Sequence, residues 1–183
     1  MQVDLVVQAS RGDRDAFATL AQATVDRCYG LAFRILRDHH RAQDATQQAL
    51  LGAWRDLPSL RDPERFEAWL YRLVVHACYV EARTQRRWTA RVQAIRGGDE
   101  DAGDPARTIA DRAELEHAFR GLSPEHRSVV VLHHHFGYPL TEIASVLGIP
   151  VGTARSRLHY AVRKLRTELD SATRRAQTEE RPA

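Results

Sequence analysis

Apolar residues recur every three or four positions in the first half of the chain, the spacing that places them on one face of an α-helix. The spacing predicts a long helix that ends near Leu36, a second helix over about 42–57, which Pro58 ends, and a third helix that begins near Pro63. Three such stripes are typical of a compact helical bundle. The side chains expected in its core are Phe17, Leu20, Ala21, Val25, Cys28, Leu31, Ala32, Ile35, Leu36, Ala45, Ala49, Ala53, Trp54, Phe66, Trp69, Leu70, Leu73, Ala77 and Val80.

The second half of the chain has the same helical spacing, interrupted by residues that begin and end helices. Ser123 can cap a helix and Pro124 can occupy its first position. Further along, Gly148 lies in a short break between two helical patterns. A short helix, a tight turn with glycine and a longer helix form the helix-turn-helix pattern. The helices are expected over about 113–122, 124–136, 140–147 and 151–169.

Neither half contains a useful length of alternating β-branched residues, so we expect an all-α protein. Between the halves, residues 97–105 (GGDEDAGDP) are acidic, polar and without an apolar period, which is typical of a flexible linker. We therefore expect two small helical domains joined by a flexible acidic linker, followed by a polar, disordered tail. The expected ranges are 1–90 and 113–170 for the domains, 91–112 for the linker and 171–183 for the tail.

Composition agrees with a folded protein, because 43% of the 183 residues are hydrophobic and 28% are charged. The sequence does not start with a basic segment followed by an apolar one, the pattern of a signal peptide, and no apolar run approaches the length of a membrane span. We therefore expect a cytoplasmic protein without membrane insertion. Cys28 and Cys78 both fall within amphipathic patterns, which favours buried thiols over a disulfide or a redox switch.

The basic residues are clustered, although the net charge of +3 is modest. All except one of the 27 basic residues are arginine. Five arginines and no acid lie between Arg83 and Arg96, and five basic residues and no acid lie between Val151 and Thr167. Such clusters on defined helices are typical of nucleic-acid binding, and a solvated helix face is the other interpretation of each cluster.

The helix expected over 151–169 has one apolar and one basic face. Arg155, Ser156 and His159 lie in its N-terminal half, which enters the major groove in helix-turn-helix docking, so they are candidates for contacts with base edges. Basic residues nearer the backbone of the DNA would add affinity rather than sequence choice. The candidates for these phosphate contacts are Arg157, Arg163, Lys164 and Arg166.

The second half resembles region 4 of the sigma-70 family, in its small two-domain extracytoplasmic-function (ECF) branch. The residues that carry the resemblance are 122–130 (LSPEHRSVV), 142–144 (EIA) and 147–159 (LGIPVGTARSRLH). The resemblance implies a sigma factor, a non-enzymatic subunit that carries RNA polymerase to a promoter and helps to open it. It also implies that this domain binds the minus-35 promoter element and rests on the flap of the polymerase β subunit.

The first half resembles region 2 of the same family, at 42–49 (AQDATQQA), at Trp54-Arg55 and at 66–73 (FEAWLYRL). The resemblance implies that region 2 docks on the clamp helices of the polymerase β′ subunit and captures the melted minus-10 element. On the second predicted helix, a polar face with an exposed leucine at its centre could receive a partner helix. This candidate polymerase-binding face consists of Asp44, Gln47, Gln48, Leu51 and Arg55.

Aromatic and basic residues interleave along the third predicted helix and beyond it. Aromatic rings stack on unpaired bases while arginine follows the phosphate backbone, which is the chemistry needed to hold a separated strand. Trp69 faces the predicted core, and Trp88 belongs to the same interleaved run. The candidates for contact with the minus-10 element are Tyr71, His76, Tyr79, Arg83, Arg86 and Arg87.

Four positions depart from the usual pattern of the family. Gln48 stands where an acidic residue is common, which would weaken the clamp contact, and His76 stands where asparagine is frequent, which leaves the base preference open. Pro139 replaces the usual capping serine before the short helix, and Tyr160 replaces a common arginine in the recognition helix. None of these changes removes the expected fold.

Three other functions compete with a sigma factor. A stand-alone helix-turn-helix regulator would use the second domain but leaves the features of the first without a role. An enzyme would rest on His133-His134-His135, but consecutive helical residues point about 100° apart and cannot all face one metal ion. A pure interaction module is the third, and the resemblance implies a possible anti-sigma factor as partner. We expect no catalytic residue, no cofactor and no metal ion.

Overall fold

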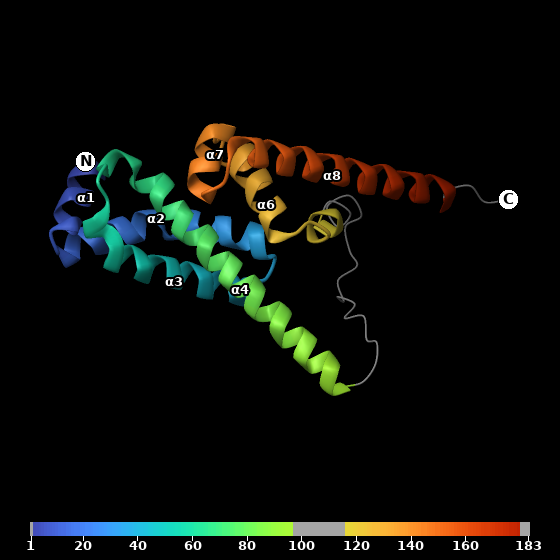
Figure 1. Cartoon of the computed structure of the whole chain (residues 1–183), viewed down its shortest axis with the longest axis horizontal. Coiled ribbons are helices and arrows are strands. Elements are labelled where there is room, and N and C mark those ends of the chain that lie inside the picture. Colours follow the sequence, from blue (N-terminus) through green and yellow to red (C-terminus); the bar gives the residue numbers. More distant parts are fainter. Residues whose placement is uncertain (1, 97–115, 180–183) are drawn as a thin grey trace.

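The computed structural model describes residues 2–96 and 116–179, and every regular element within these ranges is helical (Figure 1). The expectation of an all-α fold is confirmed. The chain forms two modules that match the two predicted helical units. The N-terminal module consists of α1 (Gln2–Ser10), α2 (Arg14–Leu36), α3 (His39–Asp56) and α4 (Phe66–Arg96), with the 3-10 turns η1 (Leu57–Ser59) and η2 (Pro63–Arg65) between α3 and α4.

Polar caps set the starts of two helices in this module. The side chain of Asp13 accepts hydrogen bonds from two backbone N–H groups in the first turn of α2, both at 3.0 Å. Asp38 does the same for α3 with one N–H group at 2.9 Å. Helix α2 ends at Leu36, and the next residue, Arg37, adopts a left-handed conformation with φ of 58°. The short connection at Arg37 and Asp38 therefore folds α3 back along α2.

The core of the N-terminal module lies where α2, α3 and α4 meet. Leu20, Leu31 and Ile35 of α2 are fully buried, as are Leu70 and Val74 of α4. From α3, the buried apolar residues are all alanines, which lets this helix approach its neighbours closely. They are Ala42, Ala45, Ala49 and Ala53.

The C-terminal module has a helical stretch over 116–120 followed by the elements of the predicted helix-turn-helix. Ser123 caps α6 by accepting a hydrogen bond from the N–H of His126. The predicted helix over 124–136 changes near its middle to a π-helical turn. The elements are α6 (Pro124–Val130), the π-helical turn η3 (Val131–His135), α7 (Leu140–Leu147) and α8 (Val151–Glu179).

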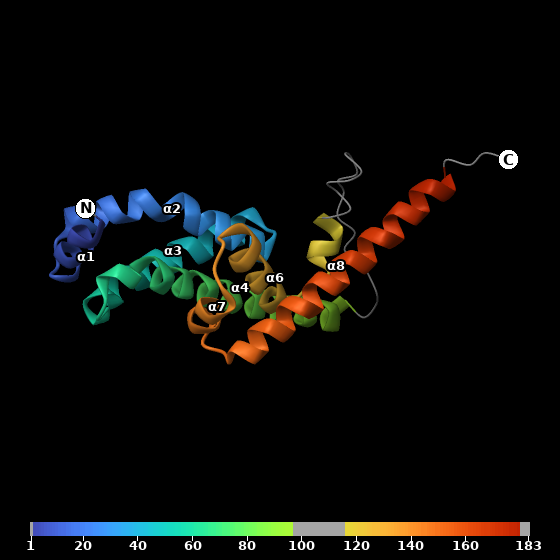
Figure 2. The same ribbon diagram turned by 90° about the horizontal axis from the view of Figure 1, so that it is seen from above.

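The two modules pack against each other rather than standing apart (Figure 2). The ring of Tyr71 on α4 makes edge-on contacts with the rings of Phe136 and Tyr138, at centroid distances of 5.0 and 6.0 Å. One apolar cluster contains buried residues of both modules, including Val75 of α4 and Ile143 of α7. We call this contact between α2 and α4 on one side and α6, η3 and α7 on the other the module junction.

Several expectations about extent and burial were wrong. Helix α1 was not predicted, and it is short, with Val6 and Ala9 as its buried residues. Helix α4 continues to Arg96, six residues into the expected linker 91–112, whose remaining part lies outside the described residues. Helix α8 continues to Glu179, so most of the expected disordered tail 171–183 is helical. Trp54 and Val80 were expected in the core but are 37% and 47% exposed.

Candidate nucleic-acid interface

The turn between α7 and α8 sets the direction of the last helix. Gly148 has φ of 64°, a left-handed conformation in which any side chain would be strained, and its N–H bonds to the carbonyls that end α7. The next N–H, of Ile149, donates to the carbonyl of Ala144 at 3.0 Å. Ala154 in the first turn of α8 is fully buried. The turn thus anchors the start of α8 and leaves the side of α8 opposite Ala154 open to solvent.

The solvent side of α8 carries the predicted base-contacting residues. Arg155, Ser156 and His159 are all exposed in the first three turns. The hydroxyl of Ser156 donates to the carbonyl of Thr153 at 3.0 Å, so its oxygen remains available as a hydrogen-bond acceptor. Two predicted phosphate contacts, Arg163 and Arg166, are exposed on the following turns.

The other two predicted phosphate contacts lie toward α6. The ammonium group of Lys164 donates to the carbonyl of Gly121 at 2.6 Å, and so holds α8 against the turn before α6. Arg157 is half-buried and lies near Tyr79 and Glu125. Burial raises the pKa of Tyr79, and the charge of Arg157 offsets part of this rise. Burial also acts to raise the pKa of Glu125, but the pKa is lowered on balance by the hydrogen bond with Ser123 and, in smaller part, by Arg157. Lys164 and Arg157 therefore each interact with another part of the protein, whereas Arg163 and Arg166 are exposed.

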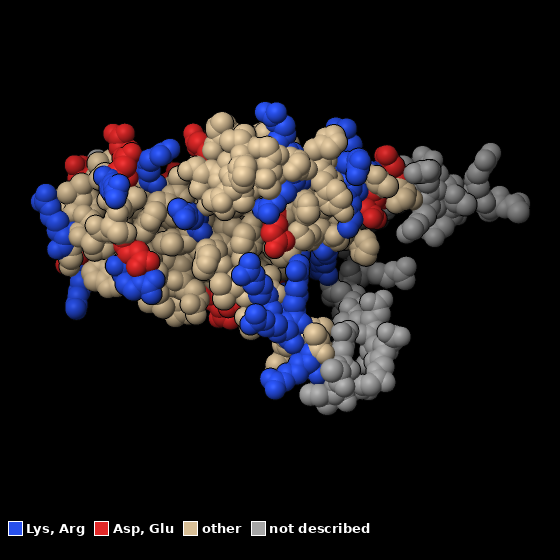
Figure 3. Space-filling view, in the orientation of Figure 1, with Lys and Arg blue, Asp and Glu red and all other residues tan. Residues whose placement is uncertain are grey.

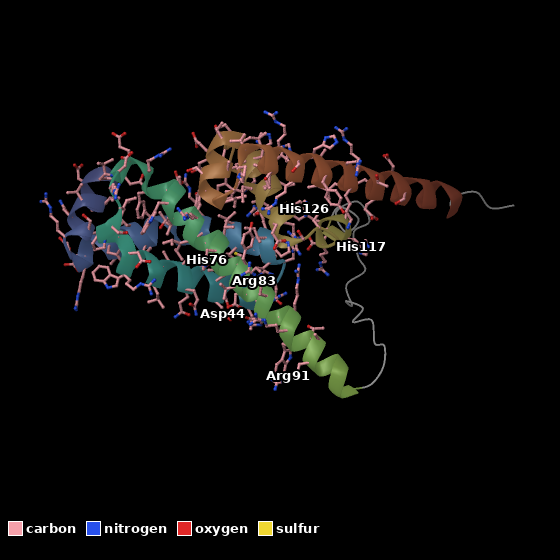
Figure 4. The ribbon with its side chains drawn as sticks, in the orientation of Figure 1. Asp44, His76, Arg83, Arg91, His117 and His126 are labelled. Carbon is pink, nitrogen blue, oxygen red and sulfur yellow. The ribbon has the colours of Figure 1, made fainter. Side chains whose placement is uncertain are left out.

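Basic residues share the exposed side of α4. At about 100° per residue, they fall within an arc of roughly 100°. Between residues 82 and 96 the sequence contains no acid. Figure 4 shows His76, Arg83 and Arg91 following one another along α4, and Figure 3 shows basic side chains gathered over the same part of the helix. We define the basic face of α4 as the exposed residues Arg72, His76, Arg83, Arg87 and Arg91.

The predicted polymerase-binding residues share one side of α3. All five of them, Asp44, Gln47, Gln48, Leu51 and Arg55, are exposed, and Leu51 is 62% exposed. The guanidinium of Arg55 donates two hydrogen bonds to the neighbouring carboxylate of Asp56, at 2.8 and 3.0 Å.

An apolar groove of about 380 Å³ opens beside this side of α3. The rings of Phe17 and Trp54 meet edge-on inside it at a centroid distance of 4.9 Å. Both rings were expected in the core, and the groove was not predicted. The sequence does contain one indication of it, because Trp54 follows Leu51 by three residues, a spacing that puts both side chains on one side of α3. The groove is lined by Phe17, Val25, Gln43, Gln47, Leu50, Leu51 and Trp54.

Comparison with known proteins agrees with both modules. Residues 20–88 match the family description Sigma-70 region 2, and residues 118–167 match Sigma-70, region 4. The ECF RNA polymerase sigma factor SigL of Mycobacterium tuberculosis is 33% identical over 170 residues, which span 86% of this chain and 93% of that protein. The chain belongs to the ECF sigma factors of the sigma-70 family. It is therefore a transcription initiation factor of RNA polymerase rather than an enzyme.

Two solved structures share the fold. One is CnrH in complex with the cytosolic domain of CnrY, with a TM-score of 0.65 and 26% identity, covering 93% of this chain and 97% of that chain. The other is the sigma factor RpoE in complex with the anti-sigma factor NepR from Bartonella quintana. It has a TM-score of 0.67 and 24% identity, covering 84% of this chain and 96% of that chain.

In this sigma factor, three of the six residues predicted at the minus-10 element lie at or beside the module junction. Tyr71 is 1% exposed, and its hydroxyl donates to Glu67 at 2.9 Å. Tyr79 is half-buried, and its hydroxyl lies 2.7 Å from that of Ser128 on α6. In the packed arrangement the C-terminal module covers both rings, so their predicted contact with the minus-10 element would require the modules to separate. Arg86 is exposed but lies beside the junction, near Glu125.

Arginines of both modules meet at the edge of the junction of this sigma factor. Arg37 forms an ion pair with Glu116, and its guanidinium lies over the rings of Phe33 and Phe119, 5.2 and 5.9 Å from their centroids. Arg127 of α6 donates to a backbone carbonyl at 2.9 Å, and burial, with neighbouring arginines, lowers its pKa to about 10. The contact between these residues could not be predicted from the sequence, because no local pattern indicates that α2 lies against α6.

The remaining candidates have structural roles. Burial raises the pKa of Cys28 and of Cys78 to about 12, so both are inert thiols at neutral pH. In the histidine run, a ring nitrogen of His133 lies 3.0 Å from the carbonyl oxygen of Tyr138.

Among the described residues, no group of three metal-binding side chains is close enough to hold an ion. In the same ranges, no helix has the length and apolar character of a membrane span.

Proposed function

We propose that this sigma factor reads the minus-35 element with α8, holds the opened minus-10 strand on the basic face of α4, and binds core RNA polymerase with the exposed side of α3. One observation carries the proposal. Each module exposes one basic helix face on which no acid intervenes, Arg83 to Arg91 on α4 and Arg155 to Arg166 on α8. Two such faces on separate modules suit two separate DNA elements.

The exposed side of α8 supports a division between base and phosphate contacts. Arg155 lies in the first two turns, where a recognition helix reaches deepest into the major groove, and its guanidinium can pair with guanine. Ser156 and His159 add a hydrogen-bond acceptor and a ring at the same depth. Arg163 and Arg166 are placed for phosphates, and Arg157 and Lys164 would meet phosphates at the border with α6.

The groove beside α3 supports docking on a helical partner. Its lining is almost entirely apolar, and Leu51 projects beside it among the polar residues Asp44, Gln47 and Gln48. An apolar groove with a polar rim suits an amphipathic helix. We assign this role to the β′ clamp helices and assign a contact with the β flap to the C-terminal module. A subunit of the transcription machinery acts where the chromosome is, so we expect the chain in the cytoplasm.

The two modules have to separate when both elements are bound. By their positions the elements are about 25 base pairs apart, or ~85 Å of duplex. In the packed arrangement, Arg86 of α4 and Arg157 of α8 both lie near Glu125. Their neighbours Arg83 and Arg155 are therefore separated by only a few times the diameter of a helix, which is about 10 Å. We infer that the module junction opens on the polymerase and that opening exposes Tyr79 at the edge of the basic face.

A partner that binds both modules would oppose this separation. The structure of RpoE, which shares this fold, contains the anti-sigma factor NepR. We propose that an anti-sigma factor, if one is produced with this chain, binds the packed arrangement and keeps the modules together.

The test is transcription in vitro with core polymerase on genomic fragments. The full chain should yield RNA with a defined start site, whereas a stand-alone helix-turn-helix regulator would bind a specific duplex and not recover core polymerase in a pull-down. If sigma-free polymerase supplied with this chain made no start-site-specific RNA from any fragment, the proposal would be wrong.

A further inference from the structure

Trp88 is the most exposed large apolar side chain among the described residues, at 64%. It lies outside both apolar clusters of the described part of the chain. The next most exposed, Leu51, borders the apolar groove, where docking would cover it. Trp88 is on α4, which contributes no residue to that groove, and it precedes by three residues Arg91, which Figure 4 shows in the part of α4 that projects from the rest of the molecule. A large ring left in water in this way is typical of a binding residue.

The surroundings of Trp88 indicate the chemistry of what it binds. At about 100° per residue, Trp88 lies about 60° from Arg91, at the edge of the basic face of α4. The opposite edge of that face carries Tyr79 and borders the module junction. Arg87, Arg91 and Trp88 are exposed within five consecutive residues, and no acid lies between 82 and 96. An indole ring beside guanidinium groups suits an unpaired base between phosphates.

We propose that Trp88 stacks on an unpaired base of the opened promoter strand while Arg87 and Arg91 hold the adjacent phosphates. This rests on the proposed function and adds a binding residue to it. Trp88 is exposed already in the packed arrangement, whereas Tyr71, the ring to which the sequence assigned stacking, is buried under Phe136 and Tyr138 until the module junction opens. In a closed duplex both faces of each base are covered by its neighbours, so Trp88 acts only after the strands separate.

The experiment uses the full chain with core polymerase and a promoter fragment that the holoenzyme transcribes. Binding is measured to the duplex and to a fragment with a premelted minus-10 segment. In that segment, 2-aminopurine replaces successive bases of the non-template strand. The variants are Trp88→Ala, Trp88→Phe and, as a matched control on the same turn of α4, Thr89→Ala. Thr89 is exposed, so its truncation leaves the helix intact.

Trp88→Ala should weaken binding to the premelted fragment by roughly 5- to 100-fold and should remove the 2-aminopurine quenching at one position. Affinity for core polymerase and for the closed duplex should not change. Trp88→Phe should recover most of the loss, and Thr89→Ala should behave as the unaltered chain. A loss of core polymerase affinity in Trp88→Ala would assign the ring to the polymerase and overturn the proposal, as would identical behaviour of Trp88→Ala and Thr89→Ala. Failure of the proposed function is distinguishable, because then the unaltered chain itself would give no promoter-specific RNA.

Discussion

The hydroxyl oxygens of Tyr79 and Ser128 lie 2.7 Å apart and join α4 of the N-terminal module to α6 of the C-terminal module. The bond is part-buried at the module junction, where Ser128 also donates to the carbonyl of Glu125 at 3.0 Å. Since the hydroxyl of Ser128 has one proton, the hydroxyl of Tyr79 is then the donor between the modules. Together with the ion pair of Arg37 with Glu116, this hydrogen bond is a directional contact that helps to fix the register of the two modules.

Removing this bond should loosen the junction without unfolding either module. Tyr79→Phe keeps the ring and leaves Ser128 bonded to Glu125, so we expect a cost of about 1 kcal/mol to the packed arrangement. The measurement is the distance between fluorophores attached to the two modules. In a double-mutant cycle with Ser128→Ala, the two changes should couple. Strictly additive effects would show that the two hydroxyls do not bond in solution.

Truncation of Phe136 should open the junction further. The ring of Phe136 contacts Tyr71 at a centroid distance of 5.0 Å, so Phe136→Ala removes an apolar contact between the modules. If polymerase binds the separated form, as we propose, a larger open fraction should raise the apparent affinity for core polymerase in proportion. Small-angle scattering should report a larger radius of gyration. Thr141→Ala, an exposed change on α7, is the control, and an unchanged radius in Phe136→Ala would contradict the packed arrangement.

On α8, base and phosphate contacts should differ in sequence dependence. Arg155→Ala should cost about 1–3 kcal/mol at one base position of the minus-35 element and little on unrelated DNA. Arg163→Ala should weaken binding to all sequences alike and reduce the slope of log affinity against log salt by roughly one. Lys164 is a poorer probe, because its bond to Gly121 means that Lys164→Ala also weakens the fold. Equal effects of Arg155→Ala and Arg163→Ala on every sequence would refute this division.

On α3, a charge at Leu51 should block polymerase binding while leaving the fold intact. Leu51 is largely exposed at the apolar groove, so Leu51→Arg should change the free energy of unfolding by less than about 0.5 kcal/mol. It should nevertheless reduce recovery of core polymerase in a pull-down by at least tenfold, because the charge cannot be desolvated against an apolar partner. Ala23→Arg, an exposed change on α2, should leave recovery unchanged. Normal recovery with Leu51→Arg would place the polymerase contact elsewhere.

The two buried thiols should make the fold sensitive to alkaline pH. Burial raises the pKa of Cys28 and Cys78 from 9.0 to about 12, so the unfolded chain releases these protons first as pH rises. Their contribution to stability is therefore complete below pH 9 and decreases between pH 9 and 12. Urea unfolding of the unaltered chain should show a steeper loss of stability from pH 8 to 10 than unfolding of the Cys28→Ala/Cys78→Ala chain. Parallel pH profiles would mean that the thiols ionise in the folded state.

The helices and the faces of α8 could be predicted from the sequence because their determinants are local. The spacing of Ala154, Ala161 and Leu165 fixes which side of α8 turns inward, and Gly148 fixes where α8 can start. The residues of α3 that we predict to bind polymerase were likewise expected on an exposed face, and they are exposed. Trp54 was misassigned because a ring at the edge of an apolar stripe can line a groove as well as fill a core.

The positions of Tyr71 and Tyr79 show what local patterns omit. At about 100° per residue, each lies on the side of α4 away from its predicted core stripe, and nothing nearby in the sequence says which other element will cover it. The ring contacts of Tyr71 come from residues more than 60 positions away, at Phe136 and Tyr138.

The sequence by itself determined two helical modules, a helix-turn-helix and the clusters of arginine on α4 and α8, because helix periodicity, capping and charge are properties of neighbouring residues. Only the tertiary structure decided which aromatic rings of α4 face water. The junction buries Tyr71 and leaves Trp88 exposed, and that choice depends on surfaces that meet across the fold rather than along the chain.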